Sequence, residues 1–177
     1  MKLWAALAIA AALLSLERIF YAWVWRHPDS FRVFCERRIA GALRDPVSGV
    51  RDFFYLFKAL QAGVFVAWCY IFRGSDPAPL RTRPLALAFG LIVAGQILNL
   101  GVFLRLGGVG VFYGNIFGHE LPRCEQFPFS ILRHPQYVGA LLSIWGLFLL
   151  LRFPHQDWML LPMVETVYYG LGAHFEQ

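Results

Sequence analysis

The amino-acid sequence predicts an all-α fold, an integral-membrane helical bundle of about five transmembrane or intramembrane helices plus a short interfacial helix. Of the 177 residues, 58% are hydrophobic and 15% are charged, whereas soluble domains average about 25% charged residues. Long apolar segments recur along the chain, and a helix needs about 20 apolar residues to span a bilayer. No alternation of strands and helices is visible, which argues against a Rossmann-type domain. We therefore expect one membrane-embedded domain, residues 1–177.

The first apolar segment, residues 3–25, predicts a membrane helix. A signal peptide is the alternative, because an Ala- and Leu-rich run follows Lys2. However, the apolar run continues past Glu17 and Arg18 to Trp25, and no small-residue cleavage site follows it. It is longer than a typical signal-peptide core, so we interpret it as a retained helix.

A polar stretch, residues 26–52, separates the first two apolar segments. Within it we expect a short amphipathic helix over residues 29–43 that lies in the membrane interface. Asp29 or Ser30 is its predicted N-cap. The residues of its apolar face are Phe31, Phe34, Ile39 and Leu43.

The remaining apolar segments are residues 53–72, 85–104, 137–153 and 157–173. A Gly- and Pro-containing turn at residues 74–79 separates the first two of these. The last two are shorter than the roughly 20 residues of a full span. We expect them to be tilted, broken or partly re-entrant.

Glu165 lies in the middle of the last apolar segment. An acid at membrane depth is a functional candidate. Alternatively it is protonated and paired with a polar group of another helix, for which Gln96, Asn99 and Lys58 are the candidates. Gln96 and Asn99 could also hydrogen-bond across helices without it.

Basic residues are distributed unequally over the two sides that five spanning segments would create. Nine lie in loops 26–52 and 105–136, on the side of the C-terminus, and five lie on the other side. This asymmetry predicts that the first side is cytosolic. The net charge of +5 indicates contact with anionic lipid; nucleic acid is not an expected partner, because the basic residues are scattered. Cys35, Cys69 and Cys124 form neither a disulfide framework nor a zinc pattern.

The densest polar motif is Arg133-His134-Pro135-Gln136-Tyr137-Val138-Gly139, where a polar loop meets an apolar segment. It could be an ordinary helix start, with Pro135 in the first turn and Arg133 and His134 solvated. It could also be a binding site, because a polar cluster at a membrane boundary is costly without a ligand.

A second motif, which we name the glycine series, comprises Gly107, Gly108, Gly110, Gly114 and Gly118. Such glycines allow a backbone to approach a ligand closely. The alternative is helix packing, because Gly110, Gly114 and Gly118 recur at the four-residue spacing of closely packed membrane helices.

Together these motifs resemble those of small integral-membrane methyltransferases. The segment 133–139 is similar to the Arg-His-Pro-x-Tyr-x-Gly signature of that superfamily, and the glycine series and Phe127-Pro128-Phe129 resemble phospholipid N-methyltransferases in particular. The resemblance implies S-adenosylmethionine as donor, S-adenosylhomocysteine as product, and no metal. It implies a membrane lipid as acceptor: phosphatidylethanolamine or its mono- and dimethyl derivatives, on the way to phosphatidylcholine. The alternatives are isoprenylcysteine carboxyl or small-thiol methyl transfer on the same fold, and a non-catalytic lipid-binding scaffold.

The resemblance also implies the site residues. Those expected to bind the donor are Gly95, Gly107, Gly110, Gly114, Gly118, Arg133, His134, Pro135, Tyr137, Glu176 and Gln177. Of these, Gly95 is what remains of an upstream Gly-x-Gly, and Glu176-Gln177 stands where the family has two acidic residues. The catalytic candidates are Tyr137, His134, Glu120 and His119. Tyr137 would offer its π face to a cation, and one of the others would accept a proton.

The implied location is the endoplasmic reticulum membrane of a eukaryote or the inner membrane of a bacterium. The site would face the cytosol, because the donor is a cytosolic metabolite. A homo-oligomer is compatible with the sequence.

Overall fold

The computed structural model describes residues 2–38, 45–73, 84–121 and 124–175. The described part is helical, with no strand, which confirms the predicted fold class. The elements are α1 (Leu3–Arg26), α2 (Pro28–Arg38), α3 (Pro46–Ile71), α4 (Leu85–Val111), the 3-10 helix η2 (Gly114–Phe117), α5 (Pro135–Leu151) and α6 (Leu160–Phe175).

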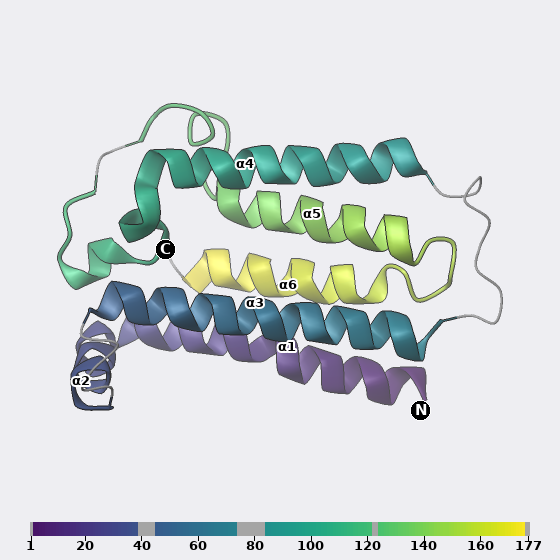
Figure 1. Ribbon diagram of the computed structural model, residues 1–177, viewed down its shortest axis with the longest axis horizontal. Coiled ribbons are helices and arrows are strands. Elements are labelled where there is room, and N and C mark those ends of the chain that lie inside the picture. The colour runs from purple at the N-terminus through teal and green to yellow at the C-terminus, as the bar shows by residue number, and fades with distance from the viewer. Residues whose placement is uncertain (1, 39–44, 74–83, 122–123, 176–177) are drawn as a thin grey trace.

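The five long helices run side by side along the longest axis, and α2 and η2 lie at one end (Figure 1). Among the described residues, α1, α3 and α4 are long and apolar enough to cross a membrane. α5 and α6 have 17 and 16 residues, which is roughly 26 and 24 Å of helix. They are therefore slightly short of a hydrocarbon core of about 30 Å, as expected.

α3 begins earlier than the apolar pattern predicts. Asp45 is its N-cap, and the Asp45 carboxylate accepts hydrogen bonds from the backbone N–H of Val47 (3.3 Å) and Ser48 (3.1 Å). Pro46 fills the first helical position, where no N–H is needed. These caps extend the helix through a polar stretch that hydropathy alone assigns to a loop.

α2 confirms the expected short helix, but its predicted N-cap is wrong. The helix begins at Pro28, so Asp29 lies in the first turn and not before it. Phe31 is fully buried and packs on rings of α1, α3 and η2, among them Phe20 and Phe117. The end of the bundle is therefore closed by an aromatic cluster on which α2 lies.

α4 and α5 pack closely through small residues. A Cβ added at Gly95 would clash with the Gly139 carbonyl oxygen, and one at Gly139 would lie 2.7 Å from the Gly95 carbonyl oxygen. Further along, a Cβ at Gly146 would lie 2.7 Å from the Ala88 carbonyl oxygen. We name this contact the α4–α5 seam. It is the small-residue packing that brings membrane helices together.

Among the five long helices, the other pairs with close backbone approach are α1 with α3, α1 with α6 and α5 with α6. Between α3 and α4 the described backbones make at most isolated contacts. The bundle therefore has a loosely packed side between these two helices.

A buried ion pair fastens the end of the bundle away from α2. The Arg152 guanidinium donates to both oxygens of Asp157 and to the Phe72 carbonyl oxygen, the latter at 2.7 Å. The Trp68 indole N–H donates to Asp157 at 2.7 Å. The pair ties the end of α3 to the end of α5 and to the loop before α6.

Candidate active site

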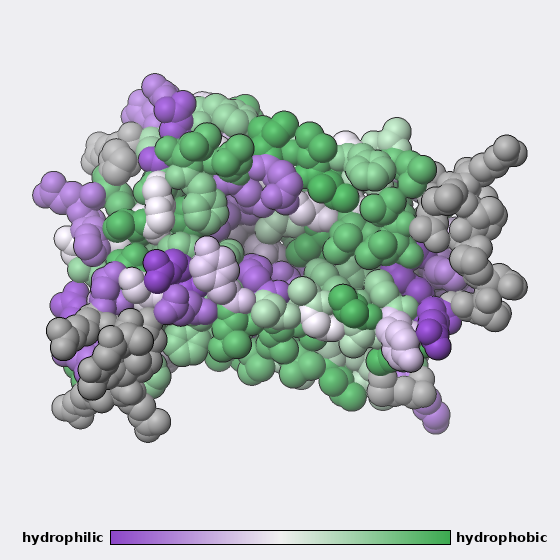
Figure 2. All heavy atoms as spheres, viewed as in Figure 1, coloured by the Kyte–Doolittle hydropathy of each residue, from purple (hydrophilic) through white to green (hydrophobic). Residues whose placement is uncertain are grey.

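A cavity of about 770 Å³ lies inside the bundle and is lined by α1, α3, α4, α5 and α6. On the side between α3 and α4 the surface is hollowed, with hydrophilic residues at the floor and hydrophobic residues around it (Figure 2). Its volume falls within the range of pockets for small ligands. Its lining is mostly apolar but includes Glu17, Arg18 and Lys58, and ionisable residues inside a membrane are expensive unless they have a function.

The Arg133–Gly139 motif lies at this cavity and also starts a helix. Pro135 is buried at the first position of α5, directly after the N-cap His134. The His134 and Tyr137 rings stack, with centroids 5.8 Å apart and planes 16° apart. Arg133, His134, Pro135 and Tyr137 all line the cavity. The two interpretations of the motif are therefore compatible.

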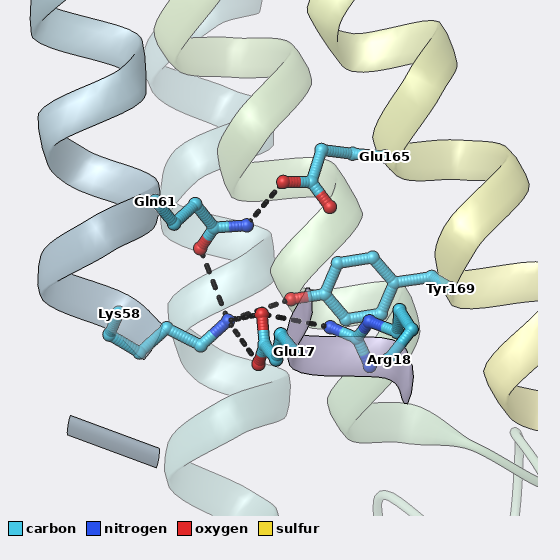
Figure 3. Close-up of polar contacts among 6 residues, drawn as sticks. All are labelled: Glu17, Arg18, Lys58, Gln61, Glu165 and Tyr169. Atoms are coloured by element: carbon cyan, nitrogen blue, oxygen red, sulfur yellow. Dashed lines mark hydrogen bonds and ion pairs between the residues drawn. The ribbon is translucent and has the colours of Figure 1, made fainter. Parts of the chain in front are cut away.

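Beside the motif lie six polar residues that we name the intramembrane cluster: Glu17, Arg18, Lys58, Gln61, Glu165 and Tyr169 (Figure 3). All of them except Glu165 line the cavity. They come in pairs from α1, α3 and α6. Glu17 and Arg18 lie roughly 12 Å or more from either end of α1, and Lys58 is deeper still within α3. The cluster is therefore at membrane depth.

Lys58 is the centre of the cluster. Its ammonium lies 3.0 Å from a Glu17 carboxylate oxygen, and it donates to the Gln61 side-chain carbonyl and to the Tyr169 hydroxyl, both at 3.1 Å. Gln61 in turn donates its amide N–H to Glu165. The expected partners of Glu165 were wrong. Gln96 bonds Ser143 instead, at 2.9 Å, Lys58 pairs with Glu17, and Asn99 lies against Gly139 of α5.

Arg18 joins the cluster to the motif. Its guanidinium lies 3.4 Å from Glu17 and stacks on the Tyr169 ring at 3.9 Å from the centroid. It is also 5.6 Å from the centroid of Tyr137, and the Tyr137 and Tyr169 rings meet edge to face at 5.4 Å. The cavity therefore holds a cation and two aromatic rings in one contact group.

Sequence reasoning missed the cluster as a unit. One signal was present, because Glu17-Arg18, Lys58 and Glu165 each interrupt an apolar segment, and ionisable residues at membrane depth are candidates for function. Their mutual contacts were not visible, because they depend on how α1, α3 and α6 pack.

The glycine series is not one helical repeat, so its interpretation as a continuous packing face is wrong. Gly107 has φ 61° and ψ −179° inside α4, a backbone conformation available essentially to glycine alone. Gly114 starts η2, and Gly118 ends it in the left-handed region at φ 91°. Of the predicted donor-binding glycines among the described residues, Gly110 lines the cavity, and Gly95 lies in the α4–α5 seam.

The alternative bases lie elsewhere. His119 and Glu120 are exposed and follow η2, outside the cavity lining. Glu176 and Gln177 lie outside the described residues. The last described residue, Phe175, packs under Arg26 at the end of the bundle that carries the motif. A role for these four residues stays a prediction.

Four buried side-chain atoms have no hydrogen-bond partner among the described residues: Arg18 Nε, Tyr21 Oη, Asn99 Oδ1 and His134 Nε2. All four residues line the cavity. Because buried polar groups are nearly always paired, their gathering around one cavity indicates a polar ligand. Among the described residues, no three His, Cys, Asp or Glu side chains are grouped as metal ligands.

Comparison with known proteins agrees with the motifs. The family model described as phospholipid methyltransferase matches residues 84–177. A phosphatidyl-N-methylethanolamine N-methyltransferase of Arabidopsis thaliana is 35% identical over 136 residues, 77% of this chain and 74% of that protein. A phosphatidylethanolamine N-methyltransferase of Rattus norvegicus is 32% identical over 92 residues, 51% of this chain and 45% of that protein. No solved structure matches.

The family match runs from the start of α4 to the chain end and contains the glycine series and the Arg133–Gly139 motif. The Arabidopsis similarity extends over three quarters of the chain. The chain therefore belongs to the phospholipid methyltransferase family.

Proposed function

We propose that this protein N-methylates phosphatidylethanolamine or its mono- and dimethyl derivatives, with S-adenosylmethionine as the methyl donor. The observation that carries the proposal is the cavity, which joins the family motif at His134 and Tyr137 to buried charges at membrane depth. A lipid amine and a soluble donor can meet at such a place with water excluded. We also propose that residues 1–177 act as one domain, because all five long helices line the cavity.

The cavity residues fit S-adenosylmethionine. Asn99 Oδ1 and His134 Nε2 are buried atoms without partners that can accept hydrogen bonds from its amino groups. The ring faces of Tyr137 and Tyr169 suit a sulfonium or a methylated ammonium. When bound, the donor supplies an electrophilic methyl group, and S-adenosylhomocysteine remains after transfer. Glu176 and Gln177 stay predicted donor ligands.

The protein's contribution is positioning and desolvation. Side chains that hold the acceptor nitrogen in line with the methyl group replace a bimolecular encounter and can supply much of the acceleration. The amine must first lose a proton, and the imidazole of His134, which lines the cavity, can accept one. We favour donor binding as its main role, with proton acceptance as the alternative.

The two substrates require different routes. We propose that the donor reaches the cavity from the bundle end that carries Arg133 and η2. The lipid would enter sideways between α3 and α4, where backbone contacts are sparse and apolar side chains such as Phe54, Leu100 and Phe103 line the cavity.

The end of the bundle with the motif is proposed to face the cytosol. α2 and η2 lie at that end (Figure 1). They belong to the sequence segments 26–52 and 105–136, which hold nine basic residues against five on the other side. The membrane is proposed to be the endoplasmic reticulum in a eukaryote or the inner membrane in a bacterium.

The proposal is tested by measuring which acceptors the protein methylates in nanodiscs when the methyl group of the donor is labelled. Diacyl phosphatidylethanolamine, soluble phosphoethanolamine, ethanolamine and a prenylcysteine are compared. We expect labelled lipid only with the diacyl acceptor. Equal methylation of the soluble head groups would refute a lipid acceptor that is reached from the bilayer. Turnover of prenylcysteine alone would favour the alternative activity, isoprenylcysteine carboxyl methyl transfer.

Site variants separate an enzyme from a scaffold. Tyr137→Ala and His134→Ala should lower turnover by roughly tenfold to a thousandfold while the protein remains folded and membrane-inserted. Arg51→Gln is the matched control, because Arg51 is exposed, outside the cavity lining, and pairs with Asp52. Wild-type turnover in both motif variants would reduce the motif to a helix start.

A further inference from the structure

In the intramembrane cluster, Arg18 and Lys58 share one directly paired carboxylate. Glu17 is shared between two cations, Arg18 at 3.4 Å and Lys58 at 3.0 Å. Glu165 receives a hydrogen bond from the neutral Gln61 amide, and no described cation lies within ion-pair distance of it. Glu17 is therefore the carboxylate that both buried cations contact directly, and the Arg18 guanidinium keeps an unpaired donor beside the cavity.

Arg18 is the cation of the cluster that presents an unpaired hydrogen-bond donor to the cavity. Its side chain is 10% exposed, it lines the cavity, and its Nε has no hydrogen-bond partner. Lys58, in contrast, has three hydrogen-bond partners within the cluster. A guanidinium has five N–H donors in a fixed fork, and a buried donor left unpaired costs free energy unless a ligand satisfies it.

Tyr21 supplies a second donor at the same place. Tyr21 follows Arg18 by three residues on α1, so the two side chains lie on the same face of the helix. The Arg18 guanidinium is 5.9 Å from the Tyr21 ring centroid. Tyr21 is 8% exposed, lines the cavity, and its buried hydroxyl is also without a partner. The unpaired Nε of the Arg18 guanidinium and the unpaired Tyr21 hydroxyl together form a site for oxygen atoms of an anion.

We infer that Arg18, with Tyr21, binds an anionic oxygen group of a substrate at membrane depth. Two sources have this chemistry: the phosphodiester of the acceptor lipid and the carboxylate of the methyl donor. In either case Arg18 fixes one substrate relative to Tyr137, whose ring lies 5.6 Å from the guanidinium. The inference rests on the proposed function and names a binding residue in α1, outside the region that the family model matches.

Three variants test the inference in nanodiscs. Tyr21→Phe removes an unpaired hydroxyl and little else, so its unfolding temperature should stay at the wild-type value or rise. Arg18→Lys keeps the charge and loses the guanidinium fork, and Arg18→Gln removes both. Arg51→Gln again controls for the loss of one positive charge at an exposed position.

The first arm measures the donor source by calorimetry, with S-adenosylhomocysteine and with 5′-methylthioadenosine, which has no carboxylate. If Arg18 and Tyr21 bind the donor carboxylate, the variants bind S-adenosylhomocysteine roughly tenfold or more weakly and bind 5′-methylthioadenosine as the wild type does.

The second arm measures the lipid source by native mass spectrometry, with phosphatidylethanolamine and with diacylglycerol, which has the same chains and no phosphate. If the site binds phosphate, the variants lose the wild-type preference for phosphatidylethanolamine while their donor binding is unchanged. Wild-type behaviour of Tyr21→Phe and Arg18→Lys in both arms overturns the inference. A wild-type protein that binds S-adenosylhomocysteine and methylates lipid in that same experiment leaves the proposed function intact.

Discussion

Substitution of Gly139 by Ala tests whether the α4–α5 seam sets the geometry of the site. The new Cβ would lie 2.6 Å from Asn99 Oδ1 and 2.7 Å from the Gly95 carbonyl oxygen, whereas ordinary contacts begin at 3.4 Å. The second neighbour is helix backbone, so α5 must move by roughly 0.7 Å. Such overpacking costs about 1–3 kcal/mol, which the better helix propensity of Ala offsets by about 1 kcal/mol.

The effect on activity should exceed the effect on stability. Gly139 follows Tyr137 by two residues, and Asn99, which the new Cβ would push, lines the cavity. A displacement approaching 1 Å at a reacting centre can lower turnover by about a hundredfold. We therefore expect Gly139→Ala to remain folded, with a modestly lower unfolding temperature, and to lose between tenfold and a hundredfold in turnover.

Two variants serve as controls. Gly146→Ala overpacks the same seam, 2.7 Å from the Ala88 carbonyl oxygen, but away from the motif. It should match Gly139→Ala in unfolding temperature and keep most of its turnover. Gly63→Ala meets no atom within 4 Å and should be neutral or more stable by up to about 1 kcal/mol. Equal turnover of the two seam variants would refute the positioning argument.

Further predictions concern the rest of the bundle. Asp157→Leu should destabilise by about 3–5 kcal/mol in thermal unfolding, because it leaves Arg152 buried without its partner, and Arg152→Met in addition should recover part of that loss. Gly107→Ala should cost about 1–3 kcal/mol, because φ is 61° there, whereas Gly108→Ala, with open space around it, should not; equal unfolding temperatures would contradict this. A single-cysteine variant that retains Cys124 should be labelled in vesicles from the cytosolic side, and labelling from the other side would reverse the proposed orientation.

Elements that depend on local pattern were largely predictable from the sequence. Hydropathy located the five long helices, and Pro135 marked the start of α5. The start of α3 was missed by seven residues, because Asp45 and Pro46 cap it within a polar stretch. The break at Gly107 was missed because a glycine in an apolar run is equally compatible with close packing.

The part of the site that is one continuous motif was predictable from the sequence, and the part that combines residues from several helices was not. His134 and Tyr137 were identified from a seven-residue pattern and lie on the cavity. Arg18 and Tyr169 were not linked to them, because they come from helices far apart in the chain and meet only through packing. The sequence shows which ionisable residues are at membrane depth, and the fold determines which of them face each other.

The Arg152–Asp157 pair has a mechanical consequence. It clamps α3, α5 and the loop before α6 together at one end, while α3 and α4 are hardly in contact along their length. The α4–α5 pair can then rotate as a unit about its fixed end at Arg152. Because α5 is roughly 26 Å long, a swing of about 5° displaces its motif end by about 2 Å. Such a swing would widen the space between α3 and α4 at the motif end without unfolding any helix, and the ion pair that limits it lies at the opposite end from the chemistry.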